Sequence, residues 1–100
     1  MTTYKLIFLR QAQKEWDKLN KSVRDQFTKK LRQRLVNPRI TGSRLRELPD
    51  CYKIKLRSVG YRLIYQVRDD QVKIVVIAVG RRDHDIVYNA ANDRISKTPD

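Results

Sequence analysis

The sequence has only one cysteine and one histidine in 100 residues, and its 11 acidic side chains are outnumbered by 23 basic ones. The lone Cys51 excludes an internal disulfide and a zinc site built from several thiolates. The lone His84 excludes a pair of histidines that act as acid and base within one chain. The acidic residues form no tight cluster suited to two-metal chemistry, and Asp69-Asp70 is typical of a turn. We therefore expect no metal and no other cofactor.

Long hydrophobic runs are also missing. No stretch approaches the roughly 18 consecutive apolar residues that a membrane-spanning helix needs. Residues 1–5 lack the apolar run of a signal peptide. We therefore expect a cytoplasmic protein that does not bind a membrane. Hydrophobic residues make up 40% of the chain and occur in periodic blocks, which predicts one small folded domain rather than a disordered basic tail.

Basic side chains are concentrated in the first four fifths of the chain, and the formal net charge is +12. Residues 1–40 carry 11 basic and 3 acidic groups, residues 41–82 carry 10 and 4, and residues 83–100 carry 2 and 4. This balance exceeds what solubility requires and indicates a polyanionic partner, nucleic acid above all. The acidic C-terminal segment could lie across a basic sheet and be displaced by a partner helix, or simply complete the core.

The first half of the chain predicts one strand and two helices. Residues 4–9 are typical of a strand, and residues 11–19 of a short helix. A longer helix follows, with Ser22 as its N-cap, and ends before Pro38 because proline disfavours helical geometry in the preceding residue. Its apolar stripe comprises Val23, Phe27, Leu31 and Leu35. Residues 39–50 predict a connecting loop.

The second half changes to strand periodicity. Runs at residues 51–57, 61–67 and 72–79 are separated by turns short enough for hairpins, which predicts an antiparallel meander. Asp83 can cap a last helix whose weaker apolar stripe comprises Ile86, Val87, Ala90, Ala91 and Ile95. We expect an α+β fold in which a small antiparallel sheet packs against two N-terminal helices and a C-terminal helix. One domain would span residues 1–95, with residues 96–100 as a frayed tail.

The predicted hairpin gathers basic side chains on one face of the sheet. Apolar and basic residues alternate in its first strand: Tyr52, Ile54 and Leu56 against Lys53, Lys55 and Arg57. In its second strand, Arg62 can join the lysines on the same face. Arg81 and Arg82 follow the third strand. Such a cluster of like charges repels itself unless an anion binds, although outward lysines can also simply solvate a sheet.

A cluster of cations suits one kind of nucleic-acid chemistry. RNA carries its own nucleophile, the 2′-hydroxyl, so a protein can cleave it by positioning the chain for in-line attack and stabilising the phosphorane with cations. Tyr88 is the candidate base, because it follows Arg82 by six residues and falls on the last helix near the basic end of the sheet. A tyrosine here can equally be an ordinary packing residue.

Several segments form a more specific pattern. In the second half they are Pro49-Asp50-Cys51-Tyr52-Lys53-Ile54-Lys55-Leu56-Arg57-Ser58, Gly60-Tyr61-Arg62-Leu63, Tyr65-Gln66-Val67 and Val79-Gly80-Arg81-Arg82. Earlier segments are Lys14-Glu15-Trp16, Lys18-Leu19, Val23-Arg24, Pro38-Arg39-Ile40 and Leu45-Arg46. Together they closely resemble the RelE toxins of bacterial toxin–antitoxin pairs, over nearly the full length of the chain.

The resemblance implies a fold like that of microbial ribonucleases. It also implies the activity of a ribosome-dependent endoribonuclease, which cuts messenger RNA in the A site without a metal and so inhibits translation. Lys53 and Lys55 resemble the family lysines that stabilise the transition state and help to activate the nucleophile. Arg62 resembles the arginine that holds the scissile phosphate, and Arg82 the one that assists the leaving 5′-oxygen. Tyr88 resembles the general base.

Three more basic residues are expected to contact RNA: Arg46, Arg57 and Arg81. The sequence departs from the family pattern in Arg81 before Arg82, in residues 83–86, and in a longer tail after Ile95. Because His84 lies beside the expected site, the acid and the base can be assigned to Tyr88, Arg82 and His84 in more than one way.

The resemblance also implies partners. These are messenger RNA on the ribosome, with 16S ribosomal RNA near the A site, and a cognate antitoxin that displaces the last helix. Operator DNA would be reached only indirectly, through the antitoxin. Two other functions are weighed against the enzyme: a non-catalytic RNA- or ribosome-binding module, and a gyrase-inhibiting relative on the same fold.

Overall fold

The computed structural model describes residues 3–81, 83 and 86–97. Its regular elements are β1 (Lys5–Phe8), α1 (Arg10–Asp17), α2 (Lys21–Val36), β2 (Cys51–Leu56), β3 (Tyr61–Arg68), β4 (Lys73–Arg81) and α3 (Ile86–Lys97). Short 3-10 turns, η1 (Thr41–Ser43) and η2 (Asp69–Gln71), lie in the connections. The predicted α+β architecture is confirmed, and each predicted helix and strand is present. α3 includes the first two residues of the expected tail.

The four strands form one sheet in the order β1-β4-β3-β2. β2, β3 and β4 are the expected antiparallel meander. β1 joins the far edge parallel to β4, with Lys5 opposite Lys73 and Phe8 opposite Val76, so the whole sheet is mixed. A parallel pair needs a long crossover, which here is everything between residues 8 and 73, and no local turn pattern in the sequence signals it.

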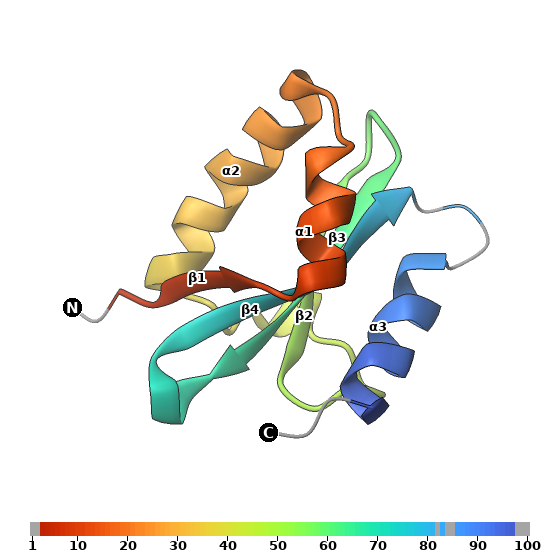
Figure 1. The fold of residues 1–100 in the computed structure, drawn as a ribbon. Helices are drawn as coiled ribbons and strands as arrows, with labels where there is room; N and C mark the ends of the chain where they lie inside the picture. The colour runs from red at the N-terminus through yellow and green to blue at the C-terminus, as the bar shows by residue number, and fades with distance from the viewer. Residues whose placement is uncertain (1–2, 82, 84–85, 98–100) are drawn as a thin grey trace.

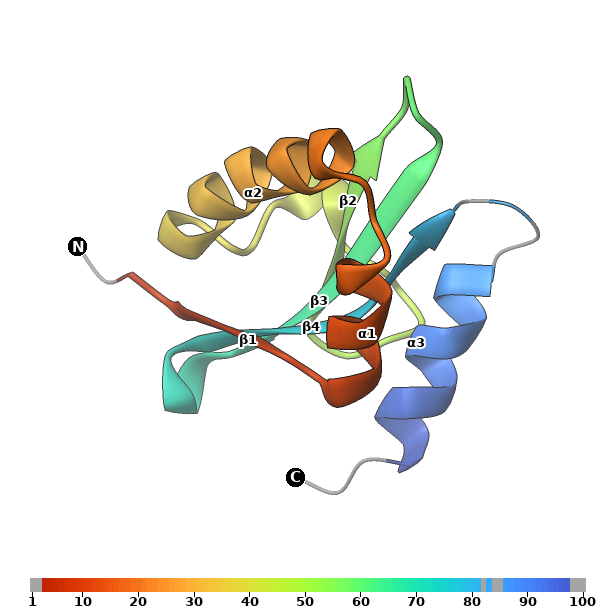
Figure 2. The same cartoon turned by 45° about the horizontal axis from the view of Figure 1, so that its top comes forward.

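The helices are arranged around the sheet as Figure 1 and Figure 2 show: α2 lies on one side, α3 on the other, and α1 between them beside the end of β1. The core beneath α1 and α2 includes Phe27, Leu31 and Tyr65, each at most 2% exposed. The core beneath α3 includes Ile64, Val87 and Ala91. Full burial of such a large apolar side chain contributes about 1.5–3 kcal/mol, so both faces of the sheet hold the fold together.

The predicted stripe of α3 is only partly correct. Val87 and Ala91 are buried and Ala90 and Ile95 are half-buried, but Ile86 is 60% exposed. Ile86 is the first residue of the helix and lies about 100° around its axis from Val87, whose side chain is buried against the sheet, so the side chain of Ile86 is directed elsewhere. In the described part of the chain, no helix is both long and apolar enough to span a bilayer.

The N-cap of α2 differs from the prediction. The helix begins at Lys21, and the side-chain oxygen of Asn20 accepts a hydrogen bond of 2.9 Å from the backbone N–H of Val23. Ser22 therefore lies inside the first turn, where its hydroxyl accepts only a long bond from Gln26 at 3.4 Å. The expected cap Asp83 precedes residues 84 and 85, which lie outside the described part, and its carboxylate is 3.4 Å from Arg81.

The position of this cap can be tested by alanine substitution. Asn20→Ala should lower the free energy of unfolding by about 1 kcal/mol, because one helix N–H loses its acceptor. Ser22→Ala is the matched control and should leave the stability unchanged within error. Urea denaturation of both variants measures the difference, and equal losses would contradict Asn20 as the cap.

Candidate functional site

The β2–β3 hairpin brings basic side chains together on one face of the sheet, as the alternation predicts. Lys55 lies directly opposite Arg62 in the register, and Lys53 lies opposite Ile64. Because residues two apart on a strand share a face, Lys53 and Lys55 lie on the same side as Arg62. That side is the one covered by α3, since Ile64 packs beneath it.

Tyr88 reaches this cluster from α3. A guanidinium nitrogen of Arg62 donates a 2.7 Å hydrogen bond to the phenol oxygen of Tyr88. The guanidinium carbon also lies 5.3 Å from the centre of the Tyr88 ring, which adds a cation–π contact. A strand residue and a helix residue that are 26 positions apart therefore form one unit, with the phenol oxygen directed at a cation.

The charges of this cluster are not neutralised. No carboxylate in the described residues lies within ion-pair distance of Lys53, Lys55, Arg57 or Arg62. The pKa of Lys55 is lowered, chiefly by the charge of Lys53 and then by desolvation and the charge of Arg62. The crowding of like charges thus disfavours another cation here and favours an anion.

The other predicted residues lie at different distances from this cluster. Arg57 is exposed just after β2. Arg81 is exposed at the end of β4, where it pairs with Asp83 and lies 5.6 Å from the centre of the Tyr61 ring. Its pKa is raised, first by the hydrogen bond with Tyr61 and then by Asp83. The cation of Arg81 is therefore already partnered.

Arg46 shares a cavity with Tyr88. This cavity has a volume of about 230 Å³ and is lined by Leu45, Arg46, Glu47, Leu48, Tyr88, Asn89 and Asn92. Arg46 and Tyr88 thus border the same space, although they come from a loop and from α3. Arg82 and His84, by contrast, lie outside the described residues.

An ion pair that the sequence analysis missed holds α3 in place. Arg94 forms two hydrogen bonds of 2.9 Å with the carboxylate of Glu15 in α1. Arg94 also donates to the carbonyl oxygen of Ile77, and the N–H of Val79 donates to Glu15. β1 pairs only with residues 73–76 of β4, so Glu15 and Arg94 satisfy backbone groups of β4 beyond the end of β1.

A glycine lets α3 approach the sheet at the level of the cluster. Gly80 of β4 lies opposite Arg62 in the register. A methyl group at Gly80 would lie 3.3 Å from a methyl carbon of Val87, closer than is comfortable in a packed interior. Since Val87 directly precedes Tyr88, the missing side chain of Gly80 helps to set the height of the phenol above the sheet.

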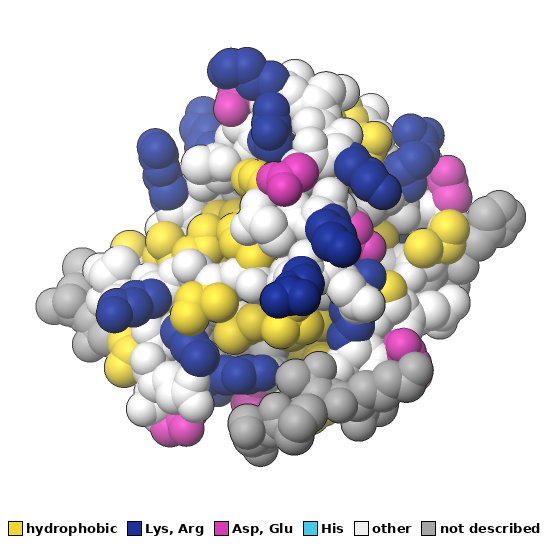
Figure 3. Space-filling model, in the orientation of Figure 1, with side chains coloured by type: hydrophobic (Ala, Val, Ile, Leu, Met, Phe, Trp, Pro, Cys, Tyr) yellow, Lys and Arg dark blue, Asp and Glu magenta, His cyan; other side chains and the backbone are white. Residues whose placement is uncertain are grey.

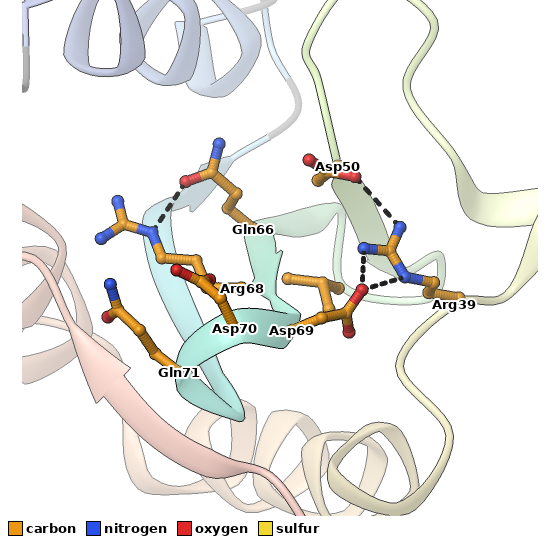
Figure 4. A pocket seen from close by; sticks show the side chains of 8 residues that line it. Arg39, Asp50, Gln66, Arg68, Asp69, Asp70 and Gln71 are labelled. Atoms are coloured by element: carbon orange, nitrogen blue, oxygen red, sulfur yellow. Dashed lines mark hydrogen bonds and ion pairs between the residues drawn. The ribbon is translucent and has the colours of Figure 1, made fainter. Parts of the chain in front are cut away.

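A second group of charged residues lies at the opposite end of β3 (Figure 4). Arg39 pairs with Asp50 at 3.1 Å and with Asp69 at 2.7 Å, beside a cavity of about 420 Å³. Hydrogen bonds from Tyr4 and Arg39 lower the pKa of Asp69. Arg39 is thus neutralised by two carboxylates, and its network fastens three connections of the fold to one another.

Figure 3 shows how charge is spread on the face seen in Figure 1. Lys and Arg side chains are scattered across this face and outnumber the acidic side chains among them, in keeping with the net charge of +12. A strip of hydrophobic surface separates some of them. Basic side chains are therefore not confined to the cluster around Arg62, and what sets that cluster apart is the phenol of Tyr88 within it.

Comparison with families of known proteins gives a match over most of the chain. The model of the family described as "ParE toxin of type II toxin-antitoxin system" matches residues 6–86. Among curated proteins, the mRNA interferase toxin RelE of Escherichia coli is 54% identical over 92 residues, which are 92% of this chain and 97% of that protein. The similarity therefore extends along nearly the whole of both chains.

Solved structures of RelE toxins are also similar to this chain over nearly its whole length. A mutant of the E. coli toxin RelE in the free state is 53% identical, with a TM-score of 0.87 over 93% of this chain and 98% of the other. The toxin in the intact E. coli RelBE toxin–antitoxin complex is 54% identical, with a TM-score of 0.78 over 81% of this chain and 99% of the other. The fold and the sequence thus match the same group of proteins.

The role of the Glu15–Arg94 pair can be tested by removing the cation. Arg94→Met should lower the free energy of unfolding by about 2 kcal/mol, less than for a fully buried pair because Glu15 is partly exposed. Hydrogen exchange of the α3 amides should also become faster. Lys14→Met, which removes an exposed charge from α1, is the control. Equal effects of the two substitutions would show that the pair does not hold α3.

Proposed function

The chain belongs to the RelE/ParE family of toxins of type II toxin–antitoxin systems, and from this premise we propose that it is an mRNA interferase. It cuts messenger RNA in the ribosomal A site and so inhibits translation. A place in the cytoplasm follows from a substrate on the ribosome. The observation that carries the proposal is the hydrogen bond between Arg62 and Tyr88 within a cluster of unneutralised lysines.

The proposed reaction uses the nucleophile that RNA itself supplies. The base takes the proton of the 2′-hydroxyl, the bond between the 2′-oxygen and phosphorus forms, and the bond from phosphorus to the 5′-oxygen breaks. The leaving 5′-oxygen receives a proton. The products are a 2′,3′-cyclic phosphate and a 5′-hydroxyl, and we assign the base, the acid and the stabilising cations to side chains of the protein.

Each residue of the cluster has a place in this reaction. Arg62 holds the scissile phosphate, and Tyr88 beside it acts as the general base. Lys53 and Lys55 stabilise the extra negative charge of the phosphorane. A cation about 6 Å from that charge contributes about 2.8 kcal/mol at an effective dielectric constant of about 20, before desolvation is subtracted. Two such cations can therefore account for a large part of a catalytic effect.

Further residues act beside this group. Arg82 is the residue we assign to the leaving 5′-oxygen, with His84 as the other candidate for the acid. Arg46, Arg57 and Arg81 contact the RNA on either side of the scissile bond. Arg46 borders the same cavity as Tyr88, which supports its contact with a nucleotide next to the reacting one.

A cognate antitoxin is the second proposed partner. The RelE of the E. coli RelBE complex is bound to its antitoxin, and α3 here lies in the acidic segment of an otherwise basic chain. Displacement of α3 would break both the Arg62–Tyr88 bond and the Glu15–Arg94 pair. Inhibition would then act by removing the base from the phosphate site. Contact with operator DNA would be through the antitoxin.

The competing functions account for fewer of these observations. A binding module explains the basic surface but gives no reason for a phenol hydrogen-bonded to Arg62. Gyrase inhibition on the same fold is the other function weighed against the enzyme. It leaves the convergence of Lys53, Lys55, Arg62 and Tyr88 unexplained, and the curated relative that we compared is an mRNA interferase.

The base can be tested with Tyr88→Phe. This substitution keeps the ring on Arg62 but removes the phenol oxygen, so single-turnover cleavage of ribosome-bound message should fall by about 100-fold or more. The affinity for ribosomes should change less than threefold, because the substitution removes only one hydrogen bond. Equal losses in both measurements would favour the binding module.

The lysines can be tested in the same assay. The double change of Lys53 and Lys55 to alanine should lower the rate constant at saturating ribosomes, because the phosphorane loses two neighbouring cations. The cut ends should be analysed in parallel, and the wild type should leave a 2′,3′-cyclic phosphate within A-site codons. Lys5→Ala, on the far edge of the sheet, is the control. An unchanged rate constant in the double variant would exclude the lysines from the mechanism.

A further inference from the structure

A purely cationic cavity lies between α2, η1 and β2. It has a volume of about 250 Å³, and its lining residues are Lys30, Arg34, Gly42, Ser43, Lys53, Ile54, Lys55 and Arg57. Five of these residues are lysine or arginine, and none is acidic. Two of the five, Lys30 and Arg34, come from α2 and do not belong to the proposed catalytic group.

Arg34 is held rigidly at the wall of this cavity. One terminal nitrogen donates to the phenol oxygen of Tyr65 at 2.7 Å and to the carbonyl oxygen of Lys53 at 3.4 Å. The other terminal nitrogen donates to the hydroxyl of Ser43 at 3.3 Å. The Tyr65 hydroxyl in turn donates to the carbonyl of Pro38 at 2.6 Å. The three bonds that Arg34 itself donates leave two of the five N–H donors of its guanidinium for a ligand.

The charges in the cavity lack counter-ions. No carboxylate in the described residues lies within ion-pair distance of Lys30, Arg34 or Arg57. Elsewhere the fold neutralises comparable arginines, Arg39 with two aspartates and Arg94 with Glu15. Since the chain pairs arginines where they fasten elements together, an unpaired and fixed Arg34 beside four more cations indicates a place for an external anion.

The cavity and the proposed catalytic cluster share strand β2. β2 is an edge strand, so Lys53 and Lys55 border this cavity as well as the face of Arg62. Because Lys53 and Lys55 border both places, an RNA strand that passes over this edge can present one phosphate to the Arg62 side and another to the cavity around Arg34.

We propose that this cavity is a second phosphate subsite, in which Lys30, Arg34 and Arg57 bind a phosphodiester group of RNA. This inference rests on the proposed function, because it takes RNA as the substrate. Ser43 supplies a neutral hydroxyl and also keeps Arg34 in position. The phosphate comes either from the message, downstream of the cut, or from ribosomal RNA. Both sources supply the same phosphodiester group. Only a phosphate of the message requires the message to extend beyond the A site.

Binding to ribosomes that carry an uncleavable message tests the subsite. The message has 2′-deoxynucleotides in the A-site codon, and it either ends directly after that codon or continues downstream. Lys30→Gln should weaken binding about five- to tenfold and reduce the salt slope by about 0.7. Lys29→Gln removes the same charge from the preceding residue of α2, which does not line the cavity. It should change the affinity less than twofold.

The two messages separate the sources of the phosphate. A loss for Lys30→Gln with the longer message only would identify a phosphate of the message. An equal loss with both messages would identify ribosomal RNA, and either outcome supports the subsite. The same loss for Lys30→Gln and Lys29→Gln on both messages would overturn it, because binding would then depend only on net charge.

A carboxylate placed in the cavity gives a second test. Ser43→Asp would pair with Arg34 and repel a phosphate, so it should weaken binding more than Lys30→Gln does. Thr41→Asp adds the same charge to the same turn without lining the cavity and is the matched control. Thermal unfolding of both variants checks the fold. Equal binding by the two variants would contradict the subsite.

The outcome does not depend on whether the chain cleaves RNA. The binding comparison uses a message that cannot be cut, so it decides on the subsite even if the wild type has no nuclease activity. If the wild type does cut normal message, Lys29→Gln, which lies outside both the catalytic cluster and the cavity, should keep its single-turnover rate constant within twofold. A failed subsite thus leaves the proposed nuclease intact, and a failed nuclease leaves the subsite testable.

Discussion

The hydrogen bond between Arg62 and Tyr88 exists only while α3 lies against the sheet at one rotation about its axis. Successive residues of a helix are about 100° apart around that axis, so Tyr88 cannot share the buried stripe of Val87 and Ala91. It reaches Arg62 because that stripe is fixed on β4, with Gly80 leaving room for Val87. The placement of the phenol is therefore a property of how the whole helix packs.

The Glu15–Arg94 pair fixes the same helix from its other end. β1 is too short to pair with the whole of β4, which leaves backbone groups of Ile77 and Val79 without a strand partner. Glu15 and Arg94 bind these groups and each other. A short edge strand thus creates the need for polar partners, and meeting that need ties α3 to α1 and β4. The pair and the phenol lie on one helix, so loss of either contact loosens the other.

Some basic side chains of the fold form ion pairs, and others lie close together without a carboxylate partner in the described residues. Arg39 and Arg94 are paired with carboxylates and connect elements that are far apart in the sequence. Lys53, Lys55 and Arg62 are placed side by side with no such partner in the described residues. Their mutual repulsion costs stability in the free protein. The same division separates the mixed-charge cavity around Arg39 from the purely cationic one around Arg34.

The sequence by itself determined which residues alternate along β2 and β3, because a strand has a side-chain period of two and a short hairpin leaves little freedom of register. Lys53, Lys55 and Arg62 on one face follow from that local rule. Other features depended on contacts between distant residues. Examples are the parallel pairing of β1 with β4 and the exposure of Ile86. The cap at Asn20 rather than Ser22 is instead a local choice, made three residues before the backbone N–H that it binds. Glu15 and Arg94 are 79 positions apart. In the sequence each is typical of an ordinary surface charge, and nothing there indicates that β1 is too short to pair with the whole of β4. Only the tertiary structure decides such pairs, because they satisfy backbone groups whose exposure arises when the sheet is assembled.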